Sequence, residues 1–209
     1  ACPKQFCDIL NVGKSFLRQT FERANQIFDT RNIFIVTGSA YEELTKQQIP
    51  EIPSENILKE PFGKNTAPCV AYAAYRIARI NPHASMVVVP SDHFITNDVV
   101  YLDNIQKGIS FVEQSGGLLT IGIKPTRPET GYGYIQIKKN KFSEFISKVK
   151  TFTEKPSKEL AKVFLESGDF LWNAGIFIWN VDDIIEEFKT YLEDIYLLFE
   201  QEYKNVENP

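Results

Sequence analysis

Residues 86–93 of this chain read MVVVPSDH, an apolar run that ends at a proline and passes directly into polar residues. Four successive apolar residues, rich in β-branched side chains, indicate a strand that is buried on both faces. Asp92 follows the end of that strand, where a carboxylate can face a ligand instead of the core. Taken alone, Asp92 is more often a turn cap, and His93 is more often structural than catalytic.

Two further apolar runs repeat this strand pattern, at residues 33–36 and 118–123. Apolar residues that recur three to four positions apart predict amphipathic helices over residues 15–28, 65–80 and 102–112. Strands that alternate with helices in this way predict an α/β fold with a mostly parallel sheet. Ligands then belong at the carboxyl ends of the strands.

Beyond residue 123 the pattern becomes less regular. A turn-rich loop precedes candidate strands at 132–137 and 149–153, a short helical pattern near 161–165, a strand at 175–179 and an acidic helical tail from Asp182. Because no repeat, linker or low-complexity segment interrupts the 209 residues, we expect one domain, or most of one.

Composition excludes several kinds of partner. The net charge is -4, and the lysines and arginines are scattered, which argues against nucleic acid. Cys2, Cys7 and Cys69 show no metal-ligand spacing and are odd in number, as is common in a reducing compartment. No apolar stretch approaches the ~20 residues of a membrane span. We therefore expect a soluble cytoplasmic protein with no membrane partner.

The first group of candidate binding residues lies at the start of the helix predicted from residue 65. The segment EPFGKNTAP at 60–68 places Lys64, Asn65 and Thr66 where a helix begins, so that free N–H groups can meet an anion or the edge of a base. A capped helix after a turn explains the same residues.

Three later motifs could contact a sugar phosphate. Gly133, in TGYGY, permits close backbone approach to a ligand, or marks a hairpin bend. Glu154 and Lys155 end another strand and could bind hydroxyl and phosphate groups, or form a surface ion pair. Asn173 offers an amide beside Trp172, which alone is more often a core residue.

Read together, the motifs resemble those of the bacterial mannose-1-phosphate guanylyltransferases from Pro3 to about residue 200. Six motifs occur in the order of that family: PKQF at 3–6, EPFGKNTAP at 60–68, SDH at 91–93, PTRPETGYGY at 125–134, FTEKP at 152–156 and WNAG at 172–175. The departures are small: Lys64 stands where arginine is usual, Ser91 and Ala174 where alanine and serine are common.

The resemblance implies a Rossmann-like nucleotidyltransferase that joins GTP and mannose 1-phosphate into GDP-mannose with release of pyrophosphate. It implies catalytic roles for Lys4 and Asp92, with Asp92 as ligand of a Mg²⁺ cofactor. It also implies nucleotide contacts from Lys4, Lys64, Asn65 and Thr66, and mannose 1-phosphate contacts from Gly133, Glu154, Lys155 and Asn173. A homodimer is compatible with it.

Parts of the family pattern fall outside these residues. The family begins with a strand and a Gly-Gly-x-Gly-x-Arg loop, and a second metal-binding aspartate is expected beyond residue 209, so we expect residues 1–209 to cover a nucleotidyltransferase domain incomplete at both ends. A mannose-6-phosphate isomerase domain, if the protein has one, lies outside this sequence. The alternatives are a related enzyme for another nucleotide or sugar, and a noncatalytic regulatory homologue.

Overall fold

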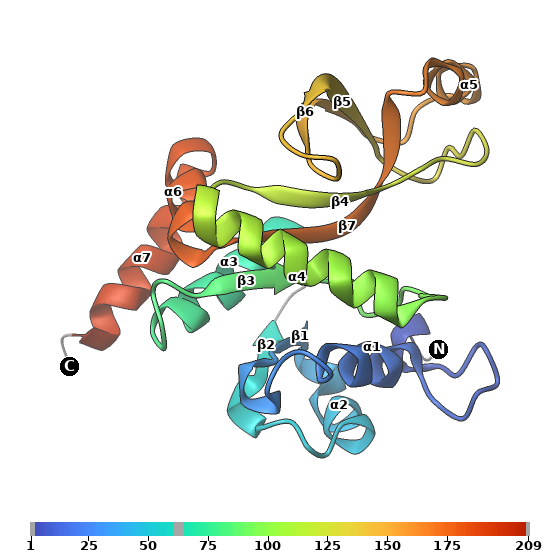
Figure 1. Ribbon diagram of the computed structural model, residues 1–209. Coiled ribbons are helices and arrows are strands. Elements are labelled where there is room, and N and C mark those ends of the chain that lie inside the picture. The colour runs from blue at the N-terminus through green and yellow to red at the C-terminus, as the bar shows by residue number, and fades with distance from the viewer. Residues whose placement is uncertain (1–2, 61–64, 208–209) are drawn as a thin grey trace. The chain divides into compact units, whose positions relative to one another are not determined.

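The computed structural model describes residues 3–60 and 65–207, which form two compact units (Figure 1). Unit 1 comprises Ala1–Leu119 and Ile178–Pro209, and unit 2 comprises Thr120–Phe177. Unit 2 is therefore an insertion in the sequence of unit 1. The last strand, β7 (Phe170–Asn180), begins in unit 2 and ends in unit 1.

Unit 1 has the alternating strands and helices that the sequence predicts. Its elements are α1 (Phe16–Ala24), β1 (Ile35–Gly38), α2 (Glu42–Gln48), β2 (Ile57–Glu60), α3 (Thr66–Ala78), β3 (Ser85–Val88), α4 (Asp98–Ser115), α6 (Val181–Tyr191) and α7 (Glu193–Glu207). β1 and β2 pair in parallel, with Ile35 opposite Ile57. The sequence interpretation missed α2, because only Thr45 of this helix is buried and no apolar stripe marks it.

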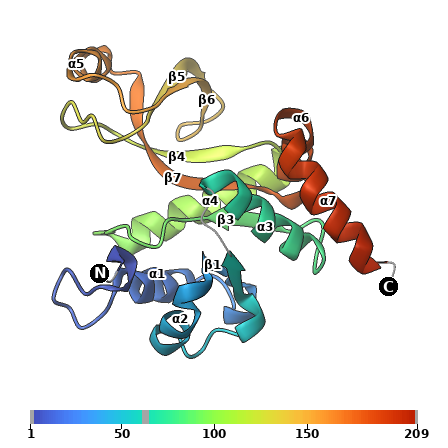
Figure 2. The same ribbon diagram turned by 180° about the vertical axis from the view of Figure 1, so that it is seen from behind.

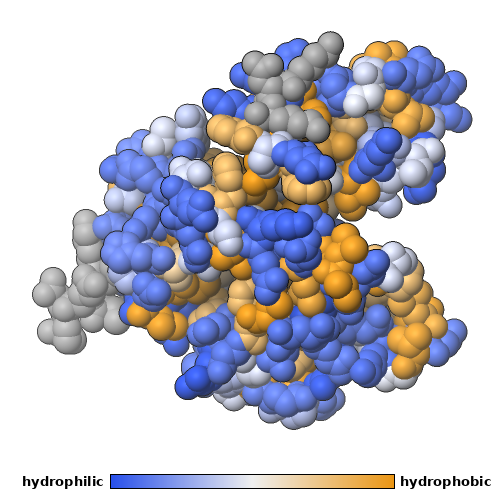
Figure 3. Space-filling view, viewed as in Figure 1, coloured by the Kyte–Doolittle hydropathy of each residue, from blue (hydrophilic) through white to orange (hydrophobic). Residues whose placement is uncertain are grey.

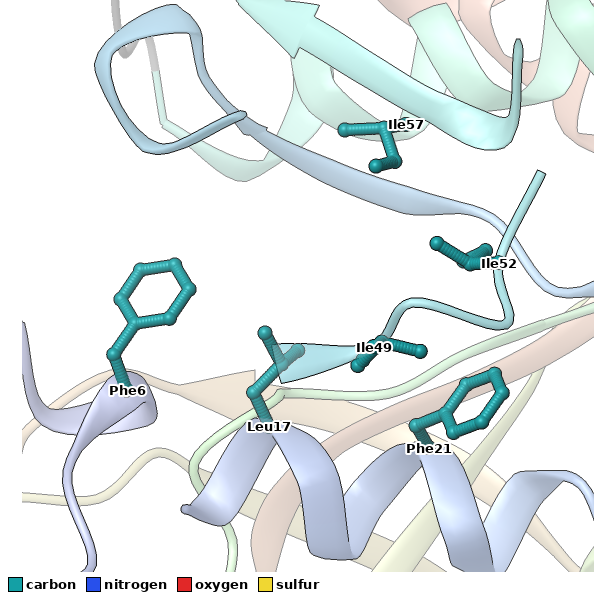
Figure 4. Close-up of a cluster of buried hydrophobic side chains, with 6 residues drawn as sticks. All are labelled: Phe6, Leu17, Phe21, Ile49, Ile52 and Ile57. Atoms are coloured by element: carbon teal, nitrogen blue, oxygen red, sulfur yellow. The ribbon is translucent and has the colours of Figure 1, made fainter. Parts of the chain in front are cut away.

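The core beside α1 explains why this helix forms and where it begins. The Ser15 side chain accepts a hydrogen bond from the Arg18 N–H and so caps the first turn. Leu17 and Phe21, one turn apart, then face the same side. Figure 4 shows the cluster that they join, which consists of Phe6, Leu17, Phe21, Ile49, Ile52 and Ile57.

A second group of helices in unit 1, α3, α6 and α7, brings together distant parts of the sequence. α3 contacts both α6 and α7, as the view from behind also shows (Figure 2). Tyr75 of α3 stacks on Phe199 of α7 with ring centroids 5.6 Å apart. In the space-filling view apolar residues are interspersed with hydrophilic ones (Figure 3). No helix within the described ranges is both long and apolar enough to cross a membrane.

Unit 2 is built on antiparallel strands. Besides β7, its elements are β4 (Leu119–Ile123), β5 (Tyr134–Lys141), β6 (Ser147–Thr153) and α5 (Lys158–Ser167). The sheet order is β3-β7-β5-β6, and β4 also pairs with β7. β5 is antiparallel to both neighbours, so that Tyr134 lies between Thr153 and Trp172. The sheets are thus mixed, and the α/β class is confirmed.

A cavity of about 470 Å³ lies inside unit 1. Its lining includes residues 33–37, which contain most of β1, and residues 84–89, which contain β3. Because alternate residues of a strand point to opposite faces, a lining made of consecutive residues indicates the edges of the two strands. Thr20 is among the lining residues, and its hydroxyl, which has almost no accessible surface, has no hydrogen-bond partner among the described residues.

Candidate active site

Two of the predicted catalytic residues lie together in unit 1. Lys4 belongs to a short 3-10 helix, Lys4–Phe6, and Asp92 follows β3. Although 88 positions separate them, Lys4 Nζ lies 3.3 Å from Asp92 Oδ2 and donates to the Asp92 backbone oxygen at 3.2 Å. The Lys4 side chain is 56% exposed and that of Asp92 41%, so both can reach a ligand. The arrangement brings one cation and one carboxylate to the carboxyl end of β3.

His93 follows Asp92 and differs from it in environment. Burial lowers the pKa of the His93 imidazole, and the Asp92 charge opposes this only in part. The neutral ring is therefore favoured at neutral pH, which agrees with a structural role. In residues 3–60 and 65–207, no group of three or more His, Cys, Asp or Glu side chains is arranged to hold a metal ion.

The predicted nucleotide contacts lie at the start of α3. Thr66 is the first helical residue, and both Asn65 and Thr66 are exposed. Asn65 has a positive φ of 68°, and its side chain makes no capping hydrogen bond to the described part of α3. With a ψ of -171°, Asn65 adopts a conformation that residues other than glycine rarely take, so its backbone is strained. Lys64 lies outside the described residues.

The predicted sugar-phosphate contacts meet at one edge of the unit 2 sheet. The register that pairs Tyr134 with Thr153 and Trp172 brings the next positions, Gly133, Glu154 and Asn173, together. The Asn173 N–H donates to the Gly133 oxygen at 2.8 Å. A Cβ atom on Gly133 would lie 2.8 Å from Glu154 Oε2, so the carboxylate end of Glu154 lies directly against this glycine. The sheet pairing thus assembles three separate sequence motifs.

Hydrogen bonds orient Asn173 within this cluster. Its Oδ1 accepts from the Gly175 N–H at 2.9 Å and lies 3.5 Å from Thr120 Oγ1. These contacts assign the amide oxygen as the acceptor, so that Nδ2 is the donor end of the side chain.

Lys155 occupies an uncommon backbone conformation. Its φ is +41°, in the left-handed region that costs energy for residues other than glycine. Its Nζ lies 3.6 Å from Glu154 Oε1, and both side chains are mainly exposed, so the ion pair is weak and the cation can reach an anion. Strain of this kind is common at ligand sites.

Sequence reasoning assigned no role to Arg127 and Glu129, which the structure joins. Glu129 Oε2 accepts from Arg127 at 2.9 Å and 3.1 Å, and Glu129 Oε1 accepts from the backbone of the next two residues. The sequence signals were the place of both residues in the PTRPETGYGY motif and their opposite charges on either side of Pro128.

Comparison with known proteins identifies the family. The sequence profile described as "Nucleotidyl transferase" matches residues 1–208. The chain belongs to the nucleotidyl transferase family. Membership confirms the fold class that the alternating strands and helices predicted, and a divalent metal is the cofactor that this family implies.

Among relatives of this nucleotidyl transferase, the mannose-1-phosphate guanylyltransferases of Salmonella montevideo and Escherichia coli are 36% and 32% identical. The alignments cover 90% and 98% of this chain but 40% and 45% of the two relatives, so the chain spans less than half of their length. The crystal structure of mannose-1-phosphate geranyltransferase from Thermus thermophilus is 26% identical, with a TM-score of 0.83 over 92% of this chain and 55% of that one.

Proposed function

We propose that the protein transfers GMP from GTP to α-D-mannose 1-phosphate, giving GDP-mannose and pyrophosphate. The observation that carries the proposal is the cluster of Gly133, Glu154 and Asn173 at one sheet edge, with Lys155 beside it. It offers a carboxylate and an amide for sugar hydroxyls and a cation for phosphate. The names of the relatives support mannose 1-phosphate as the sugar substrate, and membership of the family supports nucleotidyl transfer as the reaction.

In the proposed reaction an oxygen of the sugar phosphate attacks the α-phosphorus of GTP. A new P–O bond forms while the bond from the α-phosphorus to the bridging oxygen breaks, and pyrophosphate leaves with the electron pair. Lys4 would neutralise phosphate charge, and Lys155 would hold the attacking phosphate. Asn65 and Thr66 would contact the nucleotide at the start of α3.

The environment of Asp92 suits a shared metal. Mg²⁺ in proteins is usually held by one or two carboxylates together with substrate phosphates, and Asp92 is a partly exposed carboxylate that contacts Lys4 through Oδ2. When bound, the ion would neutralise charge on the transferred phosphates. We expect Asp92→Asn to abolish the Mg²⁺-dependent activity of the natural protein, and an unchanged rate would remove this role.

The decisive experiment measures pyrophosphate release by the full natural protein with Mg²⁺. GTP is compared with UTP, dTTP and ATP, each with mannose 1-phosphate and with glucose 1-phosphate. Selective release from GTP and mannose 1-phosphate is expected. A preference for UTP or dTTP would change the substrate assignment, and no release from any pair would favour a noncatalytic homologue.

The unit 1 cavity supports a second part of the proposal, that the domain extends beyond these 209 residues. Consecutive residues of both β1 and β3 line it, so their edges can accept hydrogen bonds from a strand placed between them. Much of the lining is apolar, including Phe21, Val70 and Met86, as the side chains of a central strand require. One additional strand would fill the cavity and join the β1–β2 sheet to β3.

A further inference from the structure

One carboxylate in unit 2 holds together the loop that leads to Gly133. Glu129 Oε1 accepts from the Thr130 and Gly131 N–H groups, each at 3.0 Å, while Oε2 accepts two hydrogen bonds from Arg127. The Gly131 N–H and the Arg127 guanidinium hold the pKa of the Glu129 carboxyl below its usual value. Its two oxygens therefore accept four charge-assisted hydrogen bonds, which are among the stronger kinds in proteins.

The same loop is attached to the sheet of unit 2 at three points. The Tyr134 hydroxyl, on a fully buried side chain, donates to the Glu129 backbone oxygen at 2.9 Å. The Arg127 guanidinium lies 5.4 Å from the centre of the Trp172 ring, and the Tyr132 ring meets Trp172 edge-on at 5.4 Å. The loop therefore has one defined path between Arg127 and β5.

That path ends at the proposed sugar-phosphate contacts. Tyr132 precedes Gly133 in sequence, and Trp172 precedes Asn173, so the ring pair adjoins the Asn173-to-Gly133 hydrogen bond. A change in the path at residues 130–132 would move the Gly133 backbone, and a shift of about 1 Å at a substrate contact can cost roughly 100-fold in rate.

We propose that Glu129 is a positioning residue for the sugar 1-phosphate: by clamping Arg127, Thr130 and Gly131 it fixes Gly133 beside Glu154 and Asn173. The inference rests on the proposed function, because it takes that edge of the sheet as the sugar-phosphate site. It assigns Glu129 no contact with substrate. The clamp acts before substrate arrives, so its loss should weaken sugar-phosphate binding and leave GTP binding nearly unchanged.

The test uses Glu129→Gln in the full natural protein. The amide keeps the size of the side chain but removes its charge and turns one acceptor into a donor that faces N–H groups. We expect the KM for the sugar 1-phosphate to rise about tenfold while the KM for GTP changes by less than about twofold. Hydrogen exchange of the Thr130 and Gly131 amides should become faster in the same variant.

Two further variants separate positioning from general damage. Glu129→Asp keeps the charge and should recover part of the sugar-phosphate affinity. Glu166→Gln makes the same chemical change on the exposed side of α5 and should leave all three measurements at wild-type values.

Each other outcome has a definite meaning. Faster exchange at Thr130 and Gly131 with an unchanged KM would show a brace for the loop alone and overturn the inference. Equal increases in both KM values would overturn it too, because positioning would then not be confined to the sugar side. A wild-type protein that is inactive with every sugar 1-phosphate would refute the proposed function and this inference with it, whereas an active wild type with an unaffected Glu129→Gln variant refutes the inference alone.

Discussion

At the scale of single residues, Lys155 combines a proposed ligand contact with a strained backbone. Lys155→Gly should relieve the positive φ and raise the free energy of unfolding by about 1 kcal/mol. The same change removes the cation, so the KM for mannose 1-phosphate should rise more than the KM for GTP. Urea unfolding and steady-state kinetics test the two effects. Equal changes in both KM values would remove the phosphate assignment.

His93 gives a prediction for pH dependence. Because burial lowers its pKa from the ordinary 6.5, the unfolded chain binds the proton first as the pH falls. Stability should therefore decrease as the pH drops below 6.5 towards the lower folded pKa, and should not fall further on this account below it. Chemical denaturation at several pH values should show this loss in wild type and in His83→Gln, but not in His93→Gln.

The residue scale also shows where sequence reasoning stopped. The identities of Gly133, Glu154 and Asn173 marked them as candidates, but their proximity follows from the pairing of β5 with β6 and β7. Strand pairing over such sequence separations is a tertiary property that no local pattern carries. The Glu129 clamp was missed for a different reason, since its donors are mostly backbone groups of an irregular loop.

At the scale of elements, long amphipathic helices were the most predictable. α1, α3 and α4 each overlap the helix that apolar spacing predicted, because one face of each packs against a core. Their ends were less accurate: α1 stops at Ala24 instead of residue 28, and α4 extends beyond 102–112 in both directions. β2 was missed because its sequence, ILKE, has only two apolar residues, whereas runs of four apolar residues marked β1 and β3. β7 begins at Phe170, five residues before the predicted start at Gly175, because the polar Asn173 interrupts the apolar run in the sequence. Its burial nevertheless alternates from Phe170 onward, as a strand requires.

The close contact between β4 and β7 gives a prediction at this scale. A Cβ atom on Gly122 would lie 2.6 Å from Leu171 Cδ1 and 2.8 Å from Leu171 Cβ. Because Leu171 Cβ cannot move without its backbone, Gly122→Ala should destabilise the protein by about 1–3 kcal/mol. Gly38→Ala is the matched control in β1, where the nearest atom is a Tyr41 ring carbon at 3.6 Å. Similar unfolding midpoints in urea for the two variants would contradict the prediction.

At the scale of the whole molecule, one residue that lines the cavity of unit 1 lowers the stability of the 209-residue chain. Burial of the Thr20 hydroxyl without a partner among the described residues costs free energy that a paired group does not. Thr20→Val removes the hydroxyl at nearly constant shape and should stabilise the 209-residue chain by about 1 kcal/mol. Thr45→Val should destabilise by a similar amount, because the Thr45 hydroxyl, equally inside a helix, donates to the Tyr41 oxygen at 2.9 Å.

The strand proposed to lie between β1 and β3 can be tested in a protein that includes it. Its backbone would pair with the edges of β1 and β3 that line the cavity. The amides on these edges should then exchange more slowly than in the 209-residue chain, since ladder hydrogen bonds protect them. Thr20→Val should keep its stabilising effect in both proteins, because the Thr20 hydroxyl has almost no accessible surface through which to meet the strand. Equal exchange of these amides with and without the added residues would mean that no strand fills the cavity.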